Sequence, residues 1–274
     1  SWCRSLAMRS ITRCVTDRST GRTALREIRI FSSQPIVTES VWDLPAAAAQ
    51  HVVKVLRLRA GETLTLFDGR GGEWETEIVE ITKSAVRVRA LQHLPIERES
   101  PLSITLWQGV ARGERMDFVV QKATELGVQR IVPVMTARCV VQLGAERADR
   151  RREHWLAVAA SACEQCGRNR LPLISEPLTL AAACDAAPDS LRCLLDPEAG
   201  STLREALEAR IDDGHPLRSV TLLVGPEGGL EQGEQQLALR AGFSAVRFGP
   251  RILRTETAAL ATIAALQCLA GDLS

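Results

Sequence analysis

The sequence predicts an α/β protein with two parts, a small β-barrel followed by a larger domain built on a mainly parallel sheet. After residue 101, apolar strand-like runs alternate with helix-like segments, which is typical of a parallel sheet covered by helices on both faces. Before residue 97 the signals are short strands and glycine-rich turns, which are typical of a small barrel. The polar stretch Glu97-Arg98-Glu99-Ser100-Pro101 separates the two patterns, and we place the domain boundary there.

Length and composition are those of an ordinary globular protein. The chain has 274 residues, 45% of them hydrophobic and 24% charged, which is enough for two domains. No apolar run reaches the roughly 20 residues of a membrane helix, because arginine or aspartate interrupts every candidate. The eight cysteines lack the spacing of a disulfide framework, and no secretory signal is visible. We therefore expect a soluble protein of the reducing cytoplasm.

Residues 1–27 are rich in arginine, serine and threonine, and we expect them to form a disordered N-terminal extension. A start-site extension ahead of the true domain and an organellar transit peptide are both compatible with this composition. Without the segment the chain carries 28 basic and 31 acidic residues, so bulk charge cannot hold RNA. Any nucleic-acid site must therefore be a local patch.

The first part, residues 28–97, combines short strands with one helix. We expect strands at residues 28–31, 63–67, 74–81 and 85–91. Pro45 favours a helix that begins there and reaches Leu58. Spacings of three along this helix put His51, Lys54 and Arg57 on one face. A helix face with these residues often contacts only solvent and has no binding role. Contact with RNA phosphates is the functional alternative.

The second part, residues 98–274, alternates strands and helices. Expected strands are residues 102–110, 130–134, 171–174, 191–195, 219–224 and 245–248. Expected helices are residues 114–126, 147–163, 178–184, 201–209, 231–241 and 258–269. The last of these helices is apolar on nearly every side, which is typical of a helix buried both in a core and in an interface.

Two unusual turns near the carboxyl terminus carry the strongest functional signal. The first, Gly225-Pro226-Glu227-Gly228-Gly229, follows an apolar run, and its glycines let the backbone come close to a ligand. The second, residues 249–257, brings arginines, threonines and a glutamate to the start of an apolar helix. Neighbouring strands that end in such turns form a crevice of the kind in which open α/β sheets bind ligands. Two ordinary strand-to-helix turns are the alternative.

Other cofactor and metal sites are disfavoured. The first turn lacks a following Lys-Ser or Lys-Thr and does not have G-x-G-x-x-G spacing, which disfavours ATP and NAD, although a phosphate at the next helix N-terminus stays physically possible. Cys163-Glu164-Gln165-Cys166 invites a zinc or redox interpretation, but no second ligand pair lies nearby, so we expect no metal. Gly167 ends the preceding helix, and we expect the polar residues after it to point outward.

The two turns and several other motifs resemble one known family. Residues 223–230 and 249–258 resemble the signature of SPOUT-class RNA methyltransferases, and more narrowly the RsmE-type family, which methylates N3 of a uridine in small-subunit (16S) ribosomal RNA. Further matches follow in the family's order and cover about residues 29–273. They are Arg29-Ile30-Phe31, His51 with Val55-Leu56-Arg57, Phe67-Asp68-Gly69, Gln121-Lys122-Ala123-Thr124-Glu125-Leu126-Gly127 and Cys163-Glu164-Gln165-Cys166-Gly167-Arg168-Asn169.

This resemblance implies a PUA-like RNA-binding domain at residues 28–97 and a SPOUT methyltransferase domain at residues 98–274, whose end is threaded as a trefoil knot. It implies S-adenosyl-L-methionine as cofactor, small-subunit ribosomal RNA or the 30S subunit as partner, and a homodimer with the site at the subunit interface. The implied cofactor-binding residues are Leu195, Gly225, Pro226, Glu227, Gly228, Gly229, Leu230, Ile252, Leu253, Thr255, Thr257 and Ala258. The implied RNA-binding residues are Arg29, His51, Lys54, Arg57, Arg59, Arg70, Arg168 and Asn169.

The implied reaction assigns roles to three charged residues. The enzyme must align an in-line displacement, so orientation should supply most of the rate. Arg254 would stabilise negative charge that develops on the uracil oxygens. Glu256 or Glu227 would accept the proton of uridine N3, and helix N-terminal capping is the alternative role for both acids. A related methyltransferase acting on another RNA site or on a ribose 2′-hydroxyl, and a non-catalytic RNA-binding ribosome assembly factor, are the alternative functions.

Overall fold

The computed structural model describes residues 28–82, 85–139, 145–187, 190–212 and 217–273, and the expected extension at residues 1–27 lies outside them. The chain divides into two compact units. The first comprises Ser1–Glu97 and Glu164–Arg170, and the second comprises Arg98–Cys163 and Leu171–Ser274. Residues 164–170 belong to the second domain by the boundary expected at residue 97, but in the structure they group with the first unit. Their contacts with residues before Glu97 are the physical reason.

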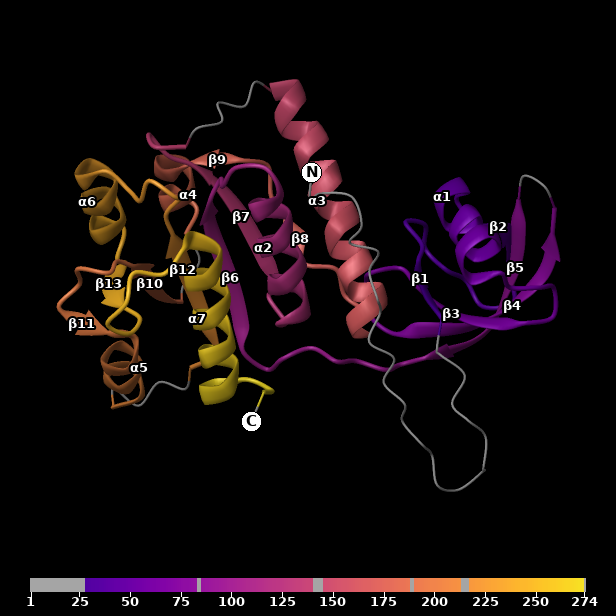
Figure 1. Ribbon diagram of the computed structural model, residues 1–274. Helices are drawn as coiled ribbons and strands as arrows, with labels where there is room; N and C mark the ends of the chain where they lie inside the picture. The colour runs from indigo at the N-terminus through magenta and orange to yellow at the C-terminus, as the bar shows by residue number, and fades with distance from the viewer. Residues whose placement is uncertain (1–27, 83–84, 140–144, 188–189, 213–216, 274) are drawn as a thin grey trace. The chain divides into compact units, whose positions relative to one another are not determined.

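The first unit is built on a five-stranded sheet with the order β1-β3-β4-β5-β2 (Figure 1). Strand β1 (Arg29–Phe31) pairs in parallel with β3 (Thr63–Phe67), and the other pairs are antiparallel. The remaining strands are β2 (Val41–Asp43), β4 (Glu73–Ile81) and β5 (Val86–Leu94). One face of this sheet packs into a core that includes Leu66, Ile78 and Val88. The sequence missed β2, which has only three residues and a mostly exposed pattern.

The helix of the first unit differs from its prediction. It consists of α1 (Ala46–Gln50) followed by the π-helix η1 (His51–Leu56), and Arg57 ends it with a left-handed φ of 55°. A π turn takes one residue more than an α turn, so a spacing of three does not return a side chain to the same face. The prediction that His51, Lys54 and Arg57 share one α-helical face is therefore wrong, although all three side chains are exposed.

Glu164 gives the first unit a half-buried titratable group. The backbone N–H of Phe31 donates to Glu164 Oε1 at 2.9 Å. Burial raises the pKa of Glu164, against the lowering effects of that hydrogen bond, His51 and Arg29. Because the pKa of Glu164 is higher in the folded than in the unfolded state, ionising this carboxyl destabilises the fold. The free energy of unfolding therefore falls as the pH rises through the folded-state pKa.

We expect Glu164→Gln to remove this pH-dependent cost, since glutamine keeps an oxygen acceptor for Phe31 and carries no charge. The free energy of unfolding of the variant, relative to the native chain, should increase as the pH rises from the ordinary glutamate range through the raised pKa. Above that range it should stay constant. Urea unfolding at a series of pH values measures the difference. A difference that does not change with pH would show that the carboxylate carries no such cost.

The second unit contains an eight-stranded sheet in which every strand pair among the described residues is parallel. Its order is β11-β13-β10-β12-β6-β7-β8, with β9 also on β7. The strands are β6 (Ser103–Gly109), β7 (Arg130–Met135), β8 (Leu173–Ile174), β9 (Leu178–Thr179), β10 (Leu191–Leu195), β11 (Ser201–Thr202), β12 (Ser219–Val224) and β13 (Ser244–Arg247). The mainly parallel sheet that the alternation predicts is confirmed.

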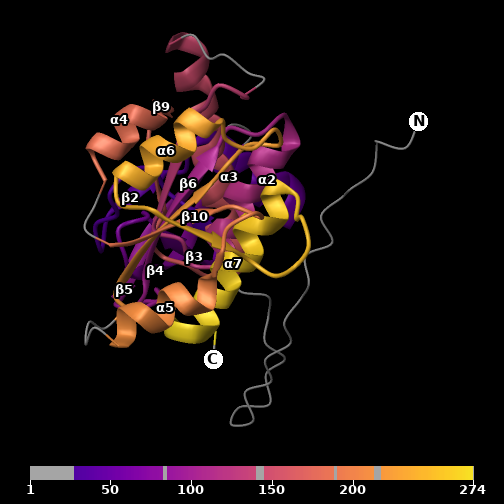
Figure 2. The same ribbon diagram turned by 90° about the vertical axis from the view of Figure 1, so that its left-hand side faces the viewer.

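Helices cover both faces of this sheet (Figure 1, Figure 2). Side chains of α2, α3, α5 and α7 pack with Leu106 and Leu222 on one face, and those of α4 and α6 pack with Trp107 and Leu223 on the other. Adjacent residues of a strand thus point to opposite faces. The helices are α2 (Glu114–Glu125), α3 (Ala145–Cys166), α4 (Leu180–Asp185), α5 (Leu203–Asp212), α6 (Gln232–Arg240) and α7 (Thr255–Ala270).

Helix α7 begins three residues earlier than its apolar pattern predicts. Thr255, Glu256 and Thr257 form its first turn, so the polar residues of the second turn motif belong partly to the helix. At its other end, Gln267 is buried and donates to the carbonyl of Leu126 at 2.8 Å, which fixes α7 against the end of α2. Within the described residues no helix is both long and apolar enough to cross a membrane. The implied knot stays a prediction.

Candidate active site

Three loops at the carboxyl ends of adjacent strands enclose a cavity of about 690 Å³ in the second unit. They follow β10, β12 and β13, which are neighbours in the sheet. The lining residues are Arg115, Arg138, Leu194, Leu195, Asp196, Pro197, Glu198, Val224, Gly225, Pro226, Glu227, Gly228, Gly229, Leu230, Gln235, Phe248, Arg251, Ile252, Leu253, Arg254, Thr255, Glu256 and Ala258. The two turns that the sequence singled out therefore meet at one site, as expected for the edge of an open α/β sheet.

The first turn is closely packed against its surroundings. The N–H of Gly229 donates to the carbonyl of Pro226 at 2.9 Å, and Gly229 has a φ of 70°. A Cβ on Gly225 would lie 3.2 Å from backbone atoms of Gly229 and Leu230. A Cβ on Gly109, the last residue of β6, would lie only 2.5 Å from the backbone nitrogen of Pro226. A side chain at Gly109 or Gly225 would thus crowd the backbone of the turn, so these glycines let the turn pack tightly against the end of β6.

Thr255 joins the two turns. Its hydroxyl donates to the carbonyl of Gly225 at 2.6 Å and accepts from Gln108 Nε2 at 2.9 Å. Gln108 and Thr255 are both buried. The hydroxyl of this predicted cofactor-binding residue therefore holds the start of α7 against the glycine-rich turn.

The three candidate catalytic residues have different surroundings. Arg254 is exposed at the N-terminus of α7 and lines the cavity. Glu256 lies in the first turn of α7, and its Oε2 is buried without a hydrogen-bond partner among the described residues. Glu227 lies in the first turn motif, outside any helix of its own, and its carboxylate accepts from the backbone N–H of Arg112 just before α2, so its role stays open. For Glu256 the position near a helix N-terminus fits either role.

Of the two candidate acids, Glu227 is the one whose carboxylate accepts hydrogen bonds from the described residues. Its Oε1 accepts from Arg115 Nη1 at 2.8 Å and from the backbone N–H of Arg112 at 3.1 Å. Burial favours a higher pKa, but backbone N–H groups of Glu227 and Arg112 and the Arg115 guanidinium outweigh it, so the pKa of Glu227 is lowered. A weaker base is less suited to take a proton from uridine N3.

The predicted cofactor-binding residues gather at this cavity, with one exception. Thr257 is exposed in the first turn of α7 and does not belong to the lining. Sequence reasoning missed Gln108, Arg115 and Arg138, which reach the turns from β6, α2 and the segment after β7. Nothing in the local pattern of these residues signals the contact. Across the described residues, no group of three or more histidine, cysteine, aspartate or glutamate side chains could hold a metal ion.

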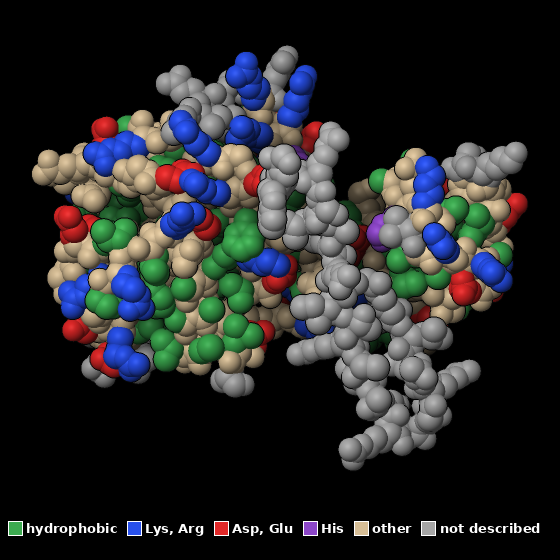
Figure 3. All heavy atoms as spheres, in the orientation of Figure 1, with side chains coloured by type: hydrophobic (Ala, Val, Ile, Leu, Met, Phe, Trp, Pro, Cys, Tyr) green, Lys and Arg blue, Asp and Glu red, His purple; other side chains and the backbone are tan. Residues whose placement is uncertain are grey.

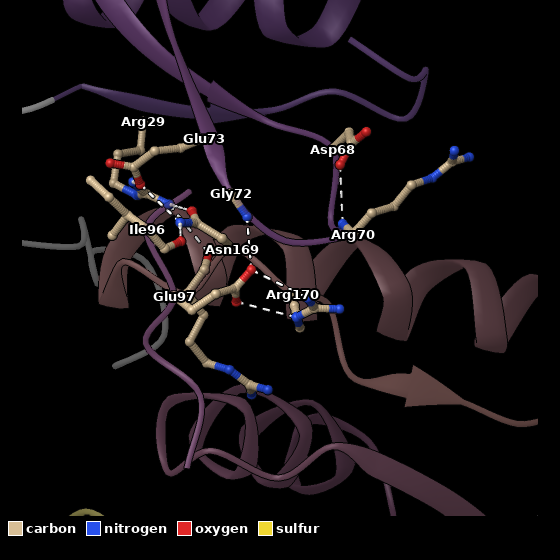
Figure 4. A network of polar contacts seen from close by, with 10 residues as sticks. Arg29, Asp68, Arg70, Gly72, Glu73, Ile96, Glu97, Asn169 and Arg170 are labelled. Atoms are coloured by element: carbon tan, nitrogen blue, oxygen red, sulfur yellow. Dashed lines mark hydrogen bonds and ion pairs between the residues drawn. The ribbon is translucent and has the colours of Figure 1, made fainter. Parts of the chain in front are cut away.

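Three of the predicted RNA-binding residues, Arg29, Arg168 and Asn169, lie in the first unit, and Figure 4 shows the contacts of Arg29 and Asn169. Arg168 is 4% exposed and Asn169 is fully buried. Asn169 Nδ2 donates to Glu73 Oε2 at 3.0 Å and to the carbonyl of Ile96 at 2.6 Å, and Arg29 donates to both Glu73 and Asn169. The prediction that side chains after Gly167 point outward is wrong for Arg168 and Asn169, because these bonds draw the segment into the unit. The side chains of Arg29 and Asn169 thus make contacts within this unit, and the RNA-binding role of all three residues stays a prediction.

The other predicted RNA-binding residues are on the surface of the first unit. His51, Lys54, Arg57, Arg59 and Arg70 all have exposed side chains. Arg70 extends from the turn after β3, where its backbone N–H donates to Asp68 Oδ1 at 3.1 Å (Figure 4). The side chains of these five residues are accessible to RNA, and their role stays a prediction.

Comparison with known proteins places the chain in a family. The RNA methyltransferase domain family matches residues 98–267, and the RNA methyltransferase PUA domain family matches residues 44–91. The ribosomal RNA small subunit methyltransferase E of Buchnera aphidicola subsp. Schizaphis graminum is 33% identical, over 90% of this chain and 98% of that protein. The chain belongs to the ribosomal RNA small subunit methyltransferase E family.

A second relative and two solved structures show the same likeness. The Bacillus subtilis protein is 28% identical over 88% of this chain and 97% of its own length. A solved methyltransferase of Legionella pneumophila in complex with S-adenosyl methionine aligns with a TM-score of 0.84 and 39% identity, over 91% of this chain and all of that one. The methyltransferase E of Neisseria gonorrhoeae bound to S-adenosyl methionine aligns with a TM-score of 0.81 and 38% identity, over 90% of this chain.

Proposed function

We propose that the chain transfers a methyl group from S-adenosyl-L-methionine to N3 of a uridine in 16S ribosomal RNA. The cavity at the ends of β10, β12 and β13 carries this proposal. Its size is within the usual range for a small-molecule site, and it combines apolar side chains such as Leu195 and Leu230 with residues of the glycine-rich turn. These residues fit an adenine ring and a ribose. Solved relatives bind this cofactor, which supports the same use here.

Within this site we propose separate roles for two charged residues. When bound, the cofactor supplies a methyl group already activated by its sulfonium. Arg254 would stabilise negative charge on the uracil oxygens as N3 loses its proton. Glu256 is the better proton acceptor of the two acids, because its Oε2 has no other partner among the described residues. Glu227 already accepts two hydrogen bonds.

The first unit would hold the RNA. The exposed group His51, Lys54, Arg57, Arg59 and Arg70 offers cationic side chains for phosphate contact. Contacts of this kind position a nucleic acid and carry little sequence information. The chain is nearly neutral overall, so only these few side chains would contact phosphates. We therefore expect the affinity for RNA to fall with salt concentration by an amount set by the number of these contacts.

We also propose that the chain works in the cytoplasm as a homodimer in which α2 and α7 form part of the interface. Phe118 of α2 and Leu269 of α7 are both exposed, and the two helices pack together. Hydrophobic side chains gather over α7 on the face shown in Figure 3. Sedimentation of the purified chain should give the mass of a dimer at micromolar concentration. A monomer at that concentration would contradict the proposal.

Titration calorimetry tests the cofactor site. The purified protein should bind S-adenosyl-L-methionine or its demethylated product with measurable heat. An absence of binding to either compound, with and without RNA, would refute the enzymatic function and leave an RNA-binding assembly factor as the better account.

A further inference from the structure

Arginines hold the glycine-rich turn from two sides, and the methylation reaction does not account for them. On one side, Glu227 accepts from Arg115 Nη1 at 2.8 Å and from the backbone N–H of Arg112 at 3.1 Å. Arg112 and Arg115 lie immediately before and within the first turn of α2. Helix α2 packs on α7, so this contact ties the turn to a rigid element.

On the other side, Arg138 Nη1 donates to the carbonyl of Gly228 at 2.8 Å. Gly228 lies so close to the Arg138 stem that a Cβ on the glycine would be 3.1 Å from Arg138 Cβ. The segment that carries Arg138 is itself fixed, because the N–H of Ala137 donates to Glu234 Oε1 at 2.8 Å. The other oxygen of Glu234 accepts from the N–H of Glu231 at 2.9 Å, at the start of α6.

These contacts fix two successive residues of the turn, the side chain of Glu227 and the carbonyl of Gly228, to partners far away in sequence. Arg115 and Arg138 also line the cavity. The Arg115 side chain is 45% exposed, so its ion pair contributes little to global stability. Ordering a glycine-rich turn costs much conformational entropy, so such a turn needs contacts of this kind to keep one shape. The contacts therefore act on the local order of the turn more than on the whole fold.

We propose that Arg115 and Arg138 are positioning residues that clamp residues 226–229 in the shape of the cofactor site, and that Glu227 anchors this clamp and does not accept the substrate proton. This inference rests on the proposed function in one respect, namely that the cavity beside the turn binds the cofactor. The clamp itself is a property of the protein alone.

Amide hydrogen exchange on the protein without cofactor tests the clamp directly. The Gly229 N–H, which donates to Pro226 O, reports whether the turn is closed. Arg115→Ala and Arg138→Ala should each speed exchange in residues 225–231 by about tenfold, which corresponds to about 1.4 kcal/mol. Arg138→Lys should restore part of the protection, because lysine can still donate to Gly228. The control is Arg204→Ala. Arg204 forms an ion pair with Glu208 on the exposed side of α5, so its removal should leave exchange in residues 225–231 unchanged.

Steady-state kinetics separates the two roles of Glu227. If Glu227 is an anchor, Glu227→Gln and Arg138→Ala should both raise the KM for S-adenosyl-L-methionine, and the pH dependence of kcat should keep its shape. A general base makes Glu227→Gln lower kcat and remove its acidic limb, and that result would overturn the proposal. Unchanged exchange in both arginine variants would overturn it as well. Failure of the native protein to bind the cofactor would refute the proposed function, and the exchange measurement would still decide whether the clamp exists.

Discussion

Replacing Arg254 by alanine should abolish methylation and leave the fold intact. The residue lies at the N-terminus of α7 and lines the cavity, and among the described residues no hydrogen bond or ion pair joins its guanidinium. Its removal therefore breaks no hydrogen bond or ion pair among the residues that the structure describes. Loss of a donor aimed at charge that develops in the transition state costs about 10²- to 10³-fold in kcat.

Single-turnover methylation at saturating cofactor measures this effect without interference from product release. Arg240→Ala is the matched control, since it removes an exposed arginine at the end of α6. Both variants should unfold at the temperature of the native protein. Undiminished turnover in Arg254→Ala would remove this residue from the mechanism.

Gly109→Ala should deform the cofactor site and destabilise the second unit. Its new Cβ would lie 2.5 Å from the nitrogen and 2.6 Å from Cδ of Pro226, and 2.9 Å from the carbonyl carbon of Gly225. Two of these atoms belong to the backbone of the glycine-rich turn, so no flexible side chain can give way. Overpacking of this kind costs about 1–3 kcal/mol of stability. We expect the turn to shift and the affinity for S-adenosyl-L-methionine to fall by about tenfold or more.

Gly233→Ala is the matched control for this substitution. Gly233 lies in α6, and a Cβ there would meet no atom within 4 Å. Alanine in place of an exposed helical glycine should stabilise the protein by up to about 1 kcal/mol. Urea unfolding and calorimetry compare the two variants. If Gly109→Ala bound the cofactor as the native protein does, the close approach of β6 to the turn would have no functional meaning.

Local patterns predicted most of the second unit. Apolar strand runs such as residues 191–195 and 219–224 match β10 and β12, because a fully buried parallel strand is apolar on both faces. The start of α7 was misplaced because Thr255, Glu256 and Thr257 are polar, yet they form a helical turn. The π-helix η1 was missed because the spacing of apolar residues in this short segment does not distinguish π-helical from α-helical hydrogen bonding.

The two turns were found because glycine and proline mark them directly in the sequence. Their partners were not found, since Arg138 contacts Gly228 across 90 residues and Thr255 contacts Gly225 across 30. Periodicity shows which face of an element is buried, but it does not show which distant loop meets it. The same limit explains Asn169, which follows the predicted helix end at Gly167 and then turns inward to Glu73.

Mass mapping of ribosomal RNA tests the central claim most directly. Small-subunit particles from a strain without the gene would be incubated with the purified protein and S-adenosyl-L-methionine carrying a deuterated methyl group. Nucleosides from the 16S RNA would then be separated and weighed. Our account predicts the labelled methyl on N3 of a uridine, and no label with Arg254→Ala. Label only on ribose 2′-oxygens, or on no nucleoside at all, would contradict it.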